Sequence, residues 1–201
     1  MKTKSILAIF LVAAVAVATE RVRFEADPTS NVRITGTSTL HEWSMEGPTI
    51  NGAIDIAPEL AANPLEAQAW RGEKSAVVTV RIPVAAIKSE HDRMNNIMLA
   101  AMKAGANPEI RYELTEAVAE RNGDDSFVVK SKGRLTIAGV TRDLEMNVTA
   151  KRDGDKRYLL TGEAPIKMTD FGISPPVAML GTLKTGNDVK VSFRWVVDRI
   201  Q

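Results

Sequence analysis

Apolar and polar residues alternate along much of the chain, as they do in β-strands with one buried and one solvated face. Residues 189–197 show this alternation most clearly, and residues 77–82 are rich in β-branched side chains, which favour strands. The same signals mark further segments at residues 22–26, 32–37, 40–45, 51–56, 110–118, 127–137, 144–150 and 158–166. The pattern therefore predicts an all-β chain with eight or more strands.

Glycine-containing turns separate several of these segments. Hairpin turns are predicted at Asn122-Gly123-Asp124, Ala138-Gly139-Val140 and Asp153-Gly154-Asp155. Short strands joined in sequence order are typical of a sandwich or a barrel. We favour an antiparallel barrel of about eight strands, because closure removes exposed sheet edges and leaves an interior able to hold one ligand. Residues 58–74 lack periodicity and are predicted to be a surface excursion.

One short amphipathic helix interrupts the strands. Ser89-Glu90-His91-Asp92 resembles a capping box, and Gly105 is a suitable stop. Between them, apolar residues fall on one stripe, namely Met94, Ile97, Met98, Ala101 and Met102. Such a stripe is most often core, but methionine also suits adaptable apolar surfaces. We therefore expect the helix to lie over one end of the barrel and its stripe to contact the ligand.

Alternation on the strongest strands indicates which side chains face the barrel interior. The predicted inward faces are Val78, Val80 and Ile82, then Ile110, Tyr112 and Leu114, then Val189, Val191, Phe193 and Trp195. Together with the helix stripe, these faces give the predicted ligand-binding residues: Val78, Val80, Ile82, Met94, Ile97, Met98, Met102, Ile110, Tyr112, Leu114, Val191, Phe193 and Trp195.

The first residues have the features of a secretory signal peptide. Lys2 and Lys4 precede an apolar run at residues 6–18, and Ala16-Val17-Ala18 suits cleavage after Ala18. The run is too short for a membrane-spanning helix, so no permanent membrane span is expected, although a retained anchor is the alternative. Residues 1–18 are thus a predicted signal peptide and residues 19–201 a single domain. The absence of Cys favours the periplasm or exterior of a bacterium over a eukaryotic secretory route.

Charge and metal-ligand chemistry exclude several partners. The formal net charge is +1 and the charges are interspersed, so no nucleic-acid surface is expected. His41-Glu42-Trp43-Ser44-Met45 begins like a zinc-protease motif but has Met where the second His belongs. Only His41 and His91 are present, and Cys is absent, so neither a metal nor a cofactor is expected.

No catalytic motif is found. The chain has no G-x-S-x-G elbow, P-loop or G-x-G-x-x-G segment. Glu109, Glu113, Asp143 and Glu145 could form a carboxylate pair. However, Glu109, Arg111 and Glu113 alternate with the apolar face of their strand, which indicates a solvated outer face. The sequence therefore predicts no catalytic residues.

Four segments in order resemble the YceI-like family. Residues 36–43 match its G-T-S-T-L-H-D-W segment, residues 107–112 its Y-P-x-I-x-F entry, residues 133–142 its G-x-L-T-I-x-G-V-T-K hairpin, and residues 169–173 its D-F-G-I loop. The resemblance implies an extended, eight-stranded, lipocalin-like barrel. It also implies export by bacteria and a polyisoprenoid or similar long amphiphile in an apolar tunnel. Glu42, Tyr112 and Arg142 are mild departures from the common Asp, Phe and Lys.

The resulting hypothesis is an exported protein that binds a polyisoprenoid, an isoprenoid quinone or a fatty-acid derivative. With few aromatic residues, its tunnel would select by length and width rather than by ring stacking. One alternative is a structural or adhesive barrel without ligand. Another is an enzyme acting on a lipid-like substrate, which would need a buried titratable group. Association into a homodimer is left open.

Overall fold

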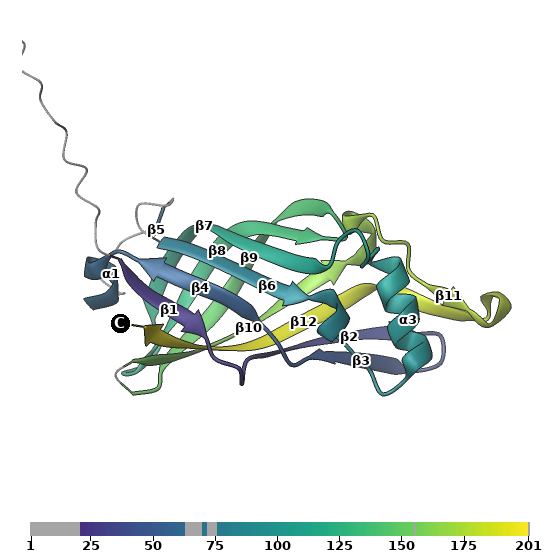
Figure 1. The fold of residues 1–201 in the computed structure, drawn as a ribbon, viewed down its shortest axis with the longest axis horizontal. Coiled ribbons are helices and arrows are strands. Elements are labelled where there is room, and N and C mark those ends of the chain that lie inside the picture. The colour runs from purple at the N-terminus through teal and green to yellow at the C-terminus, as the bar shows by residue number, and fades with distance from the viewer. Residues whose placement is uncertain (1–20, 63–69, 72–75, 155, 201) are drawn as a thin grey trace, which may run out of the picture.

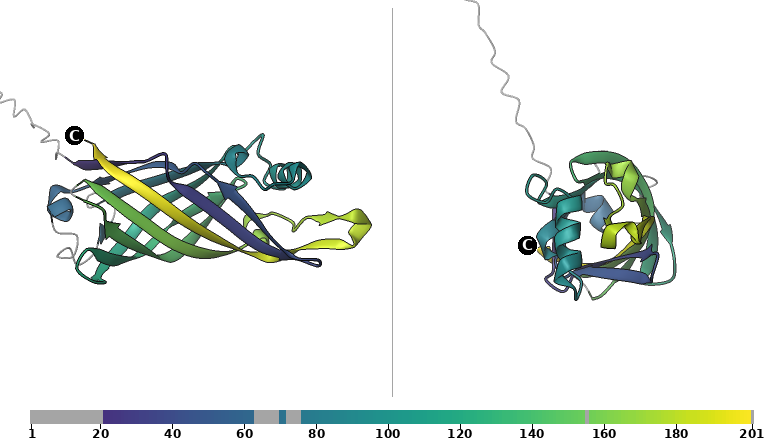
Figure 2. Two further views of the ribbon diagram at one scale, coloured as in Figure 1. Left: turned by 90° about the horizontal axis from the view of Figure 1, so that it is seen from below. Right: turned by 90° about the vertical axis from the view of Figure 1, so that its right-hand side faces the viewer.

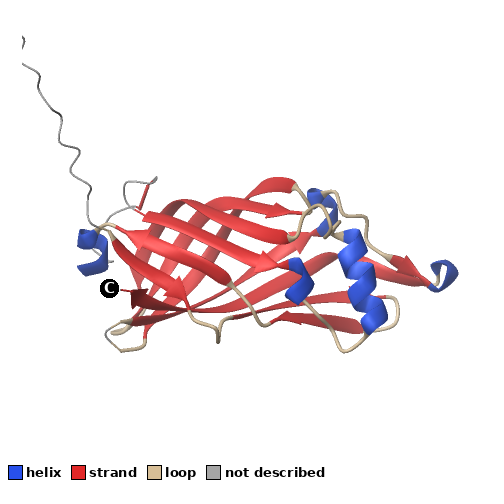
Figure 3. Cartoon of the chain, viewed as in Figure 1, coloured by secondary structure: helices blue, strands red, loops and turns tan. Residues whose placement is uncertain are grey.

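Antiparallel strands account for most of the described chain. The computed structural model describes residues 21–62, 70–71, 76–154 and 156–200 (Figures 1 and 3). Within these ranges, no helix is both long and apolar enough to cross a membrane. The predicted signal peptide, residues 1–18, lies outside the described residues.

Eight strands pair side by side into a closed ring. In ring order they are β1 (Val22–Ala26), β4 (Asn51–Ile56), β6 (Ala76–Pro83), β7 (Glu109–Arg121), β8 (Ser126–Ile137), β9 (Val140–Arg152), β10 (Arg157–Lys167) and β12 (Leu183–Ile200). β12 then pairs with β1 and closes the ring, as the end-on view in Figure 2 shows. The predicted eight-stranded antiparallel barrel is confirmed.

Two further strands lengthen the barrel wall rather than widen it. β2 (Asn31–Ser38) follows β1 along the same edge of β12, and β3 (Glu42–Gly47) pairs with β2. Ser30 lies at the break between β1 and β2 and is fully buried. Its hydroxyl donates to the Val196 carbonyl oxygen at 3.2 Å and accepts from the Val196 N–H at 3.0 Å. This side chain therefore continues the pairing with β12 where the backbone turns away.

The predicted turns lie between consecutive strands. Residues 122–125 join β7 to β8, and Asp153 and Gly154 follow the end of β9. Ala138 and Gly139 alone connect β8 to β9, with φ values of 50° and 82°. Positive φ at both central residues is what a type I′ hairpin turn requires.

The prediction of a surface excursion at residues 58–74 is wrong at its start. Residues Pro58–Ala62 form helix α1, in which Leu60 is only 5% exposed and joins the core. Pro58 suits the first helical position, and two apolar side chains follow it. A short strand, β5 (Trp70–Arg71), then pairs with β7. Helix α1 thus lies at one end of the barrel (Figure 1).

Helix α3 (Asp92–Ala101) lies at the opposite end, where a helix was predicted (Figure 2). Its N-cap is His91, which makes no side-chain cap bond, so the predicted capping box at Ser89 is wrong. Instead, the main-chain N–H and hydroxyl of Ser89 donate to Asn95 Oδ1 at 2.7 and 3.0 Å. The loop before the helix is therefore fixed by Asn95, one turn inside.

The remaining short elements also gather at the α3 end. They are the 3-10 helices η1 (Val84–Ala86), η2 (Met168–Phe171) and η3 (Met179–Gly181), and strand β11 (Val177–Ala178). β11 pairs with the start of β12, and together they project beyond the barrel (Figures 1 and 2). Phe171 of η2 is buried and packs in the core at this end.

Candidate ligand-binding cavity

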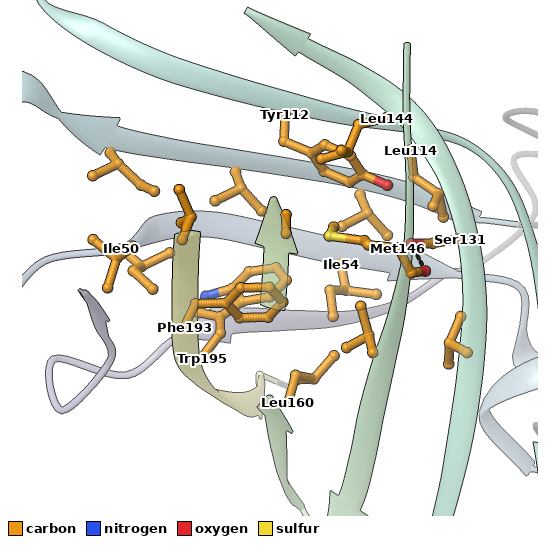
Figure 4. A pocket seen from close by; sticks show the side chains of 18 of the residues that line it. Ile50, Ile54, Tyr112, Leu114, Ser131, Leu144, Met146, Leu160, Phe193 and Trp195 are labelled. Carbon is orange, nitrogen blue, oxygen red and sulfur yellow. Dashed lines mark hydrogen bonds between the residues drawn. The ribbon is translucent and has the colours of Figure 1, made fainter. Parts of the chain in front are cut away.

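The barrel encloses an apolar cavity of about 200 Å³. Its wall is built by the inward faces of the ring strands, because successive side chains of a strand point to opposite sides of the sheet. Aliphatic and aromatic side chains make up almost all of this wall. Figure 4 draws 18 of these side chains around the space and labels ten of them, from Ile50 to Trp195.

The predicted inward faces lie where alternation placed them. The strand residues that line the cavity are Val78, Val80 and Ile82 of β6, Ile110, Tyr112 and Leu114 of β7, and Val191, Phe193 and Trp195 of β12. Val189 faces inward further along and packs against the core at the α3 end. Lys190 and Arg194 are exposed, as the register requires. That these side chains contact a ligand stays a prediction.

The predicted helix stripe does not line the cavity. Met102 is buried and Met98 half-buried, and both pack into the apolar cluster at the α3 end. That cluster includes Tyr112 and Leu135, which do line the cavity. Met94 and Ile97 are half-buried on α3. The stripe therefore lies behind the cavity wall, and its contact with a ligand stays a prediction.

Sequence analysis did not single out the cavity residues of several other elements. They come from α1, β2, β4, β8, β9 and β10 and include Ile34, Ile54, Ala61, Val129, Ser131, Leu144, Met146, Leu160 and Ile166. The signal was present on β8, where Phe127, Val129, Ser131 and Leu135 share one parity. The same alternation on the remaining strands predicts most of this wall.

Only four side chains with polar atoms line the cavity among the described residues, and none is charged. The Ser131 hydroxyl donates to the Met146 carbonyl oxygen at 3.0 Å, which Figure 4 marks. Arg152 Nη2 donates to the Tyr158 hydroxyl at 3.3 Å. The Tyr112 hydroxyl and the Trp195 indole N–H have no hydrogen-bond partner in the described structure. Burial raises the pKa of Tyr112, and the nearby Ser131 hydroxyl opposes this more weakly.

A glycine on the neighbouring strand makes room for Tyr112. A Cβ at position 133 of β8 would lie 2.4 Å from Cζ of the Tyr112 ring. The phenol end of the ring, including its hydroxyl, therefore lies against Gly133 of β8. Residue 133 belongs to the predicted 133–142 hairpin segment, so this motif also positions a cavity residue.

The carboxylates considered as a catalytic pair lie on the outer surface. Glu113 pairs with Arg134 at 2.8 Å, Glu145 with Lys132 at 2.8 Å, and Glu109 with Arg111 at 3.1 Å. Asp143 is exposed. The interpretation of these residues as a solvated face is confirmed.

The two histidines are also on the surface. His41 and His91 are both exposed, and His41 Nδ1 lies 2.7 Å from the Glu42 carbonyl oxygen. Over the ranges that the structure describes, His, Cys, Asp and Glu form no group of three or more that could hold a metal ion. What the site provides is an uncharged, apolar enclosure with two unused hydrogen-bonding atoms.

The fold and its cavity define a class, that of closed antiparallel β-barrels with an apolar interior. Residues 24–197 match the family model described as the YceI-like domain. The chain belongs to this family, and the resemblance found in its motifs is confirmed. No curated protein matches the chain at a significant level.

Solved structures of bacterial proteins share the fold. A polyisoprenoid binding domain from Saccharophagus degradans superposes with a TM-score of 0.65 at 13% identity, covering 88% of this chain and 98% of that one. BcnA of Burkholderia cenocepacia gives 0.62 at 16% identity, with 85% and 98% covered. The YceI protein of Campylobacter jejuni gives 0.53 at 15% identity, with 100% and 99% covered. At these identities the likeness concerns the fold alone.

Proposed function

We propose that this protein is an exported, non-enzymatic binding protein that holds a long-chain amphiphile inside its barrel. The observation that carries the proposal is the composition of the cavity wall, in which no described side chain is charged. Each CH₂ group buried there contributes roughly 0.8 kcal/mol, so a long chain binds without any charged or catalytic group. Polyisoprenoids, isoprenoid quinones and fatty-acid derivatives have this chemistry, and their carriage, storage or use in stress protection would follow.

The size of the cavity limits how a long chain can bind. About 200 Å³ is smaller than typical ligand pockets, which range over roughly 300–1,000 Å³. Leu60 and Ala61 of α1 lie at one end of the barrel, and the cluster around Phe171 and Met102 lies at the other. A long chain therefore requires side chains at one of these ends to move as it enters.

Two further observations support the proposal. One of the solved structures with this fold is described as a polyisoprenoid binding domain. The carboxylates that an enzyme of lipid-like substrates could use are paired with cations on the outer surface instead of facing the cavity. A barrel without ligand, serving structure or adhesion, is the first alternative, and an enzyme acting on a lipid-like substrate is the second.

Solvent extraction tests the proposal. Purified mature protein extracted with organic solvent should release a long-chain lipid, identified by mass spectrometry. Leu144→Trp fills the cavity and should reduce the amount released several-fold. Asp143→Trp places the same ring on the outer face of the same strand and should leave it unchanged. Wild-type protein that yields no lipid would support the barrel without ligand.

Export has a separate test. The signal-like residues 1–18 motivate it. Expressed from its full gene in a Gram-negative host, the protein should appear in the periplasmic fraction with Thr19 as its first residue. A cytoplasmic product that begins at Met1 would contradict the export part of the proposal and leave the binding part standing.

A further inference from the structure

Among the described residues, the cavity wall contains two buried hydrogen-bond donors that have no partner in hydrogen-bond geometry, although the Ser131 hydroxyl lies close enough to Tyr112 to act on its pKa. They are the Tyr112 hydroxyl and the Trp195 indole N–H, and the side chains that carry them are 8% and 4% exposed. The other polar side chains of the wall, Ser131 and Tyr158, are already paired. A buried donor left unpaired costs free energy, and phenylalanine would fill the Tyr112 position with almost the same shape without this cost. A purely apolar ligand chain would leave both donors without a hydrogen-bond partner, so their presence needs another explanation.

The donors lie on opposite sides of the barrel. Tyr112 is on β7 and Trp195 on β12, which are four strands apart in either direction around the eight-stranded ring. Tyr112 belongs to the core cluster at the α3 end, and Trp195 to the cluster at the α1 end. Both donors are therefore buried inside the barrel, one nearer each end.

The chemistry of these atoms defines what would pair with them. An indole N–H can only donate, so its partner must be an acceptor. A phenol donates equally well. The neighbouring Ser131 hydroxyl gives its own proton to Met146 and could only accept from Tyr112, but the two hydroxyls are not in hydrogen-bond geometry. The described wall supplies no positive charge, so a buried phosphate or carboxylate would remain uncompensated. The complementary group is a neutral oxygen acceptor, such as a ketone, ester, ether or quinone oxygen.

We infer that the ligand carries a neutral hydrogen-bond acceptor within its buried part, held by the Tyr112 hydroxyl or the Trp195 N–H. This inference rests on the proposed function and specifies its ligand class. It separates neutral, oxygen-bearing chains from plain hydrocarbons and from chains whose only polar group is an anionic head outside the barrel. Gly133 keeps the Tyr112 ring in place, so the donor is oriented before the ligand arrives.

Matched probes test this inference. Heptadecane, heptadecan-2-one and heptadecan-9-one have the same chain length and differ in the presence and position of one carbonyl. Their affinities are measured by competition with a bound fluorescent fatty-chain probe. Wild-type protein should bind at least one ketone about tenfold more tightly than the alkane, since one neutral hydrogen bond is worth up to that factor.

Tyr112→Phe and Trp195→Phe identify the donor. One of them should abolish the preference for the ketone while leaving the alkane affinity within about twofold. In wild-type protein, the infrared carbonyl stretch of the preferred ketone should shift to lower frequency, and the same variant should reverse this shift. Thr136→Val removes a hydroxyl outside the cavity, where it pairs with Thr141 at 2.8 Å, and should keep both the preference and the shift.

The outcomes distinguish the two proposals. Equal binding of alkane and ketones by wild-type protein would overturn this inference alone, and would indicate that Ser131 or a water molecule satisfies the donors. A ketone preference that survives both Phe variants would overturn it as well. Failure of every probe to bind would overturn the proposed function together with it.

Discussion

The Tyr112 ring on β7 lies directly over Gly133 on β8, so closely that a Cβ at position 133 would be 2.4 Å from the ring. Gly133→Ala should therefore force the ring to move and cost about 1–3 kcal/mol of unfolding free energy, as overpacking does. Urea denaturation measures this cost. Gly105→Ala is the matched control, because a Cβ there meets nothing within 4 Å, and its effect should stay within about 1 kcal/mol. Similar stability of both variants would contradict the close packing of Tyr112 on β8.

The Ser30 hydroxyl is expected to stabilise the closure of the barrel. It makes two hydrogen bonds to the backbone of Val196, and Ser30→Ala would leave the buried Val196 N–H without a partner. Leaving such a group unpaired costs about 1–3 kcal/mol. Thermal and urea unfolding should both report the loss. Ser174→Ala, at an exposed serine, should change stability by less than about 0.5 kcal/mol. A neutral Ser30→Ala would mean that a shift of the backbone or a water molecule replaces the hydroxyl.

Asp27 should make stability depend on acidic pH. Its pKa is lowered from 3.8, first by hydrogen bonds from the Thr29 hydroxyl and main-chain N–H, and then by the charge of Arg157. Because the folded-state pKa lies below the unfolded value, the carboxylate stabilises the fold above about pH 4, and this contribution is lost as pH falls through the folded-state pKa. Asp27→Asn keeps an acceptor for Thr29 but removes the charge.

Urea denaturation at several pH values measures this contribution. Wild-type protein should be more stable than Asp27→Asn at pH 7, and the difference should shrink below about pH 4. A difference that stays constant down to pH 2 would show that the charge of Asp27 plays no part.

The strands could be predicted from the sequence because the two faces of each wall strand differ in chemistry. Along β7, Tyr112 and Leu114 face the cavity, and Glu113 between them pairs with Arg134 outside. Such alternation is a local property that a sequence displays directly. The pairing of β12 with both β1 and β2 is not a local property, because it depends on contacts between residues about 160 positions apart in the sequence. The sequence therefore predicts the strands better than it predicts how they share one wall.

Helix α1, the position of the α3 stripe and the unpaired donors could not be predicted from sequence periodicity. Helix α1 has five residues, too few for a helical pattern, and only the folded barrel places Leu60 at its end. The stripe on α3 was predicted, but Met98 and Met102 pack in a cluster with Phe171 and Ile173, which come from another part of the chain. The unpaired donors of Tyr112 and Trp195 appear only when every neighbour is known.

Variants of Met98 distinguish two roles for the α3 stripe, namely core packing and contact with the ligand. Met98 packs against the cluster behind the cavity wall, so a chain longer than the cavity that leaves by this end would displace the cluster to which Met98 belongs. Met98→Leu nearly conserves volume and should cost under about 1.5 kcal/mol, yet it replaces an adaptable side chain with a fixed shape. We expect this variant to release lipids of altered chain length at a nearly unchanged melting temperature.

Met98→Ala removes most of the side chain and should cost about 1–3 kcal/mol, less than the roughly 2–5 kcal/mol of a fully buried site, because Met98 is half-buried. Asn96→Ala, at an exposed position of α3, serves as the control and should change neither lipid profile nor stability appreciably. Mass spectrometry of the extracts and thermal unfolding give the two readouts for each variant. If Met98→Leu retains the wild-type profile, and Met98→Ala destabilises without altering it, then α3 only packs against the barrel, and the chain enters from the α1 end.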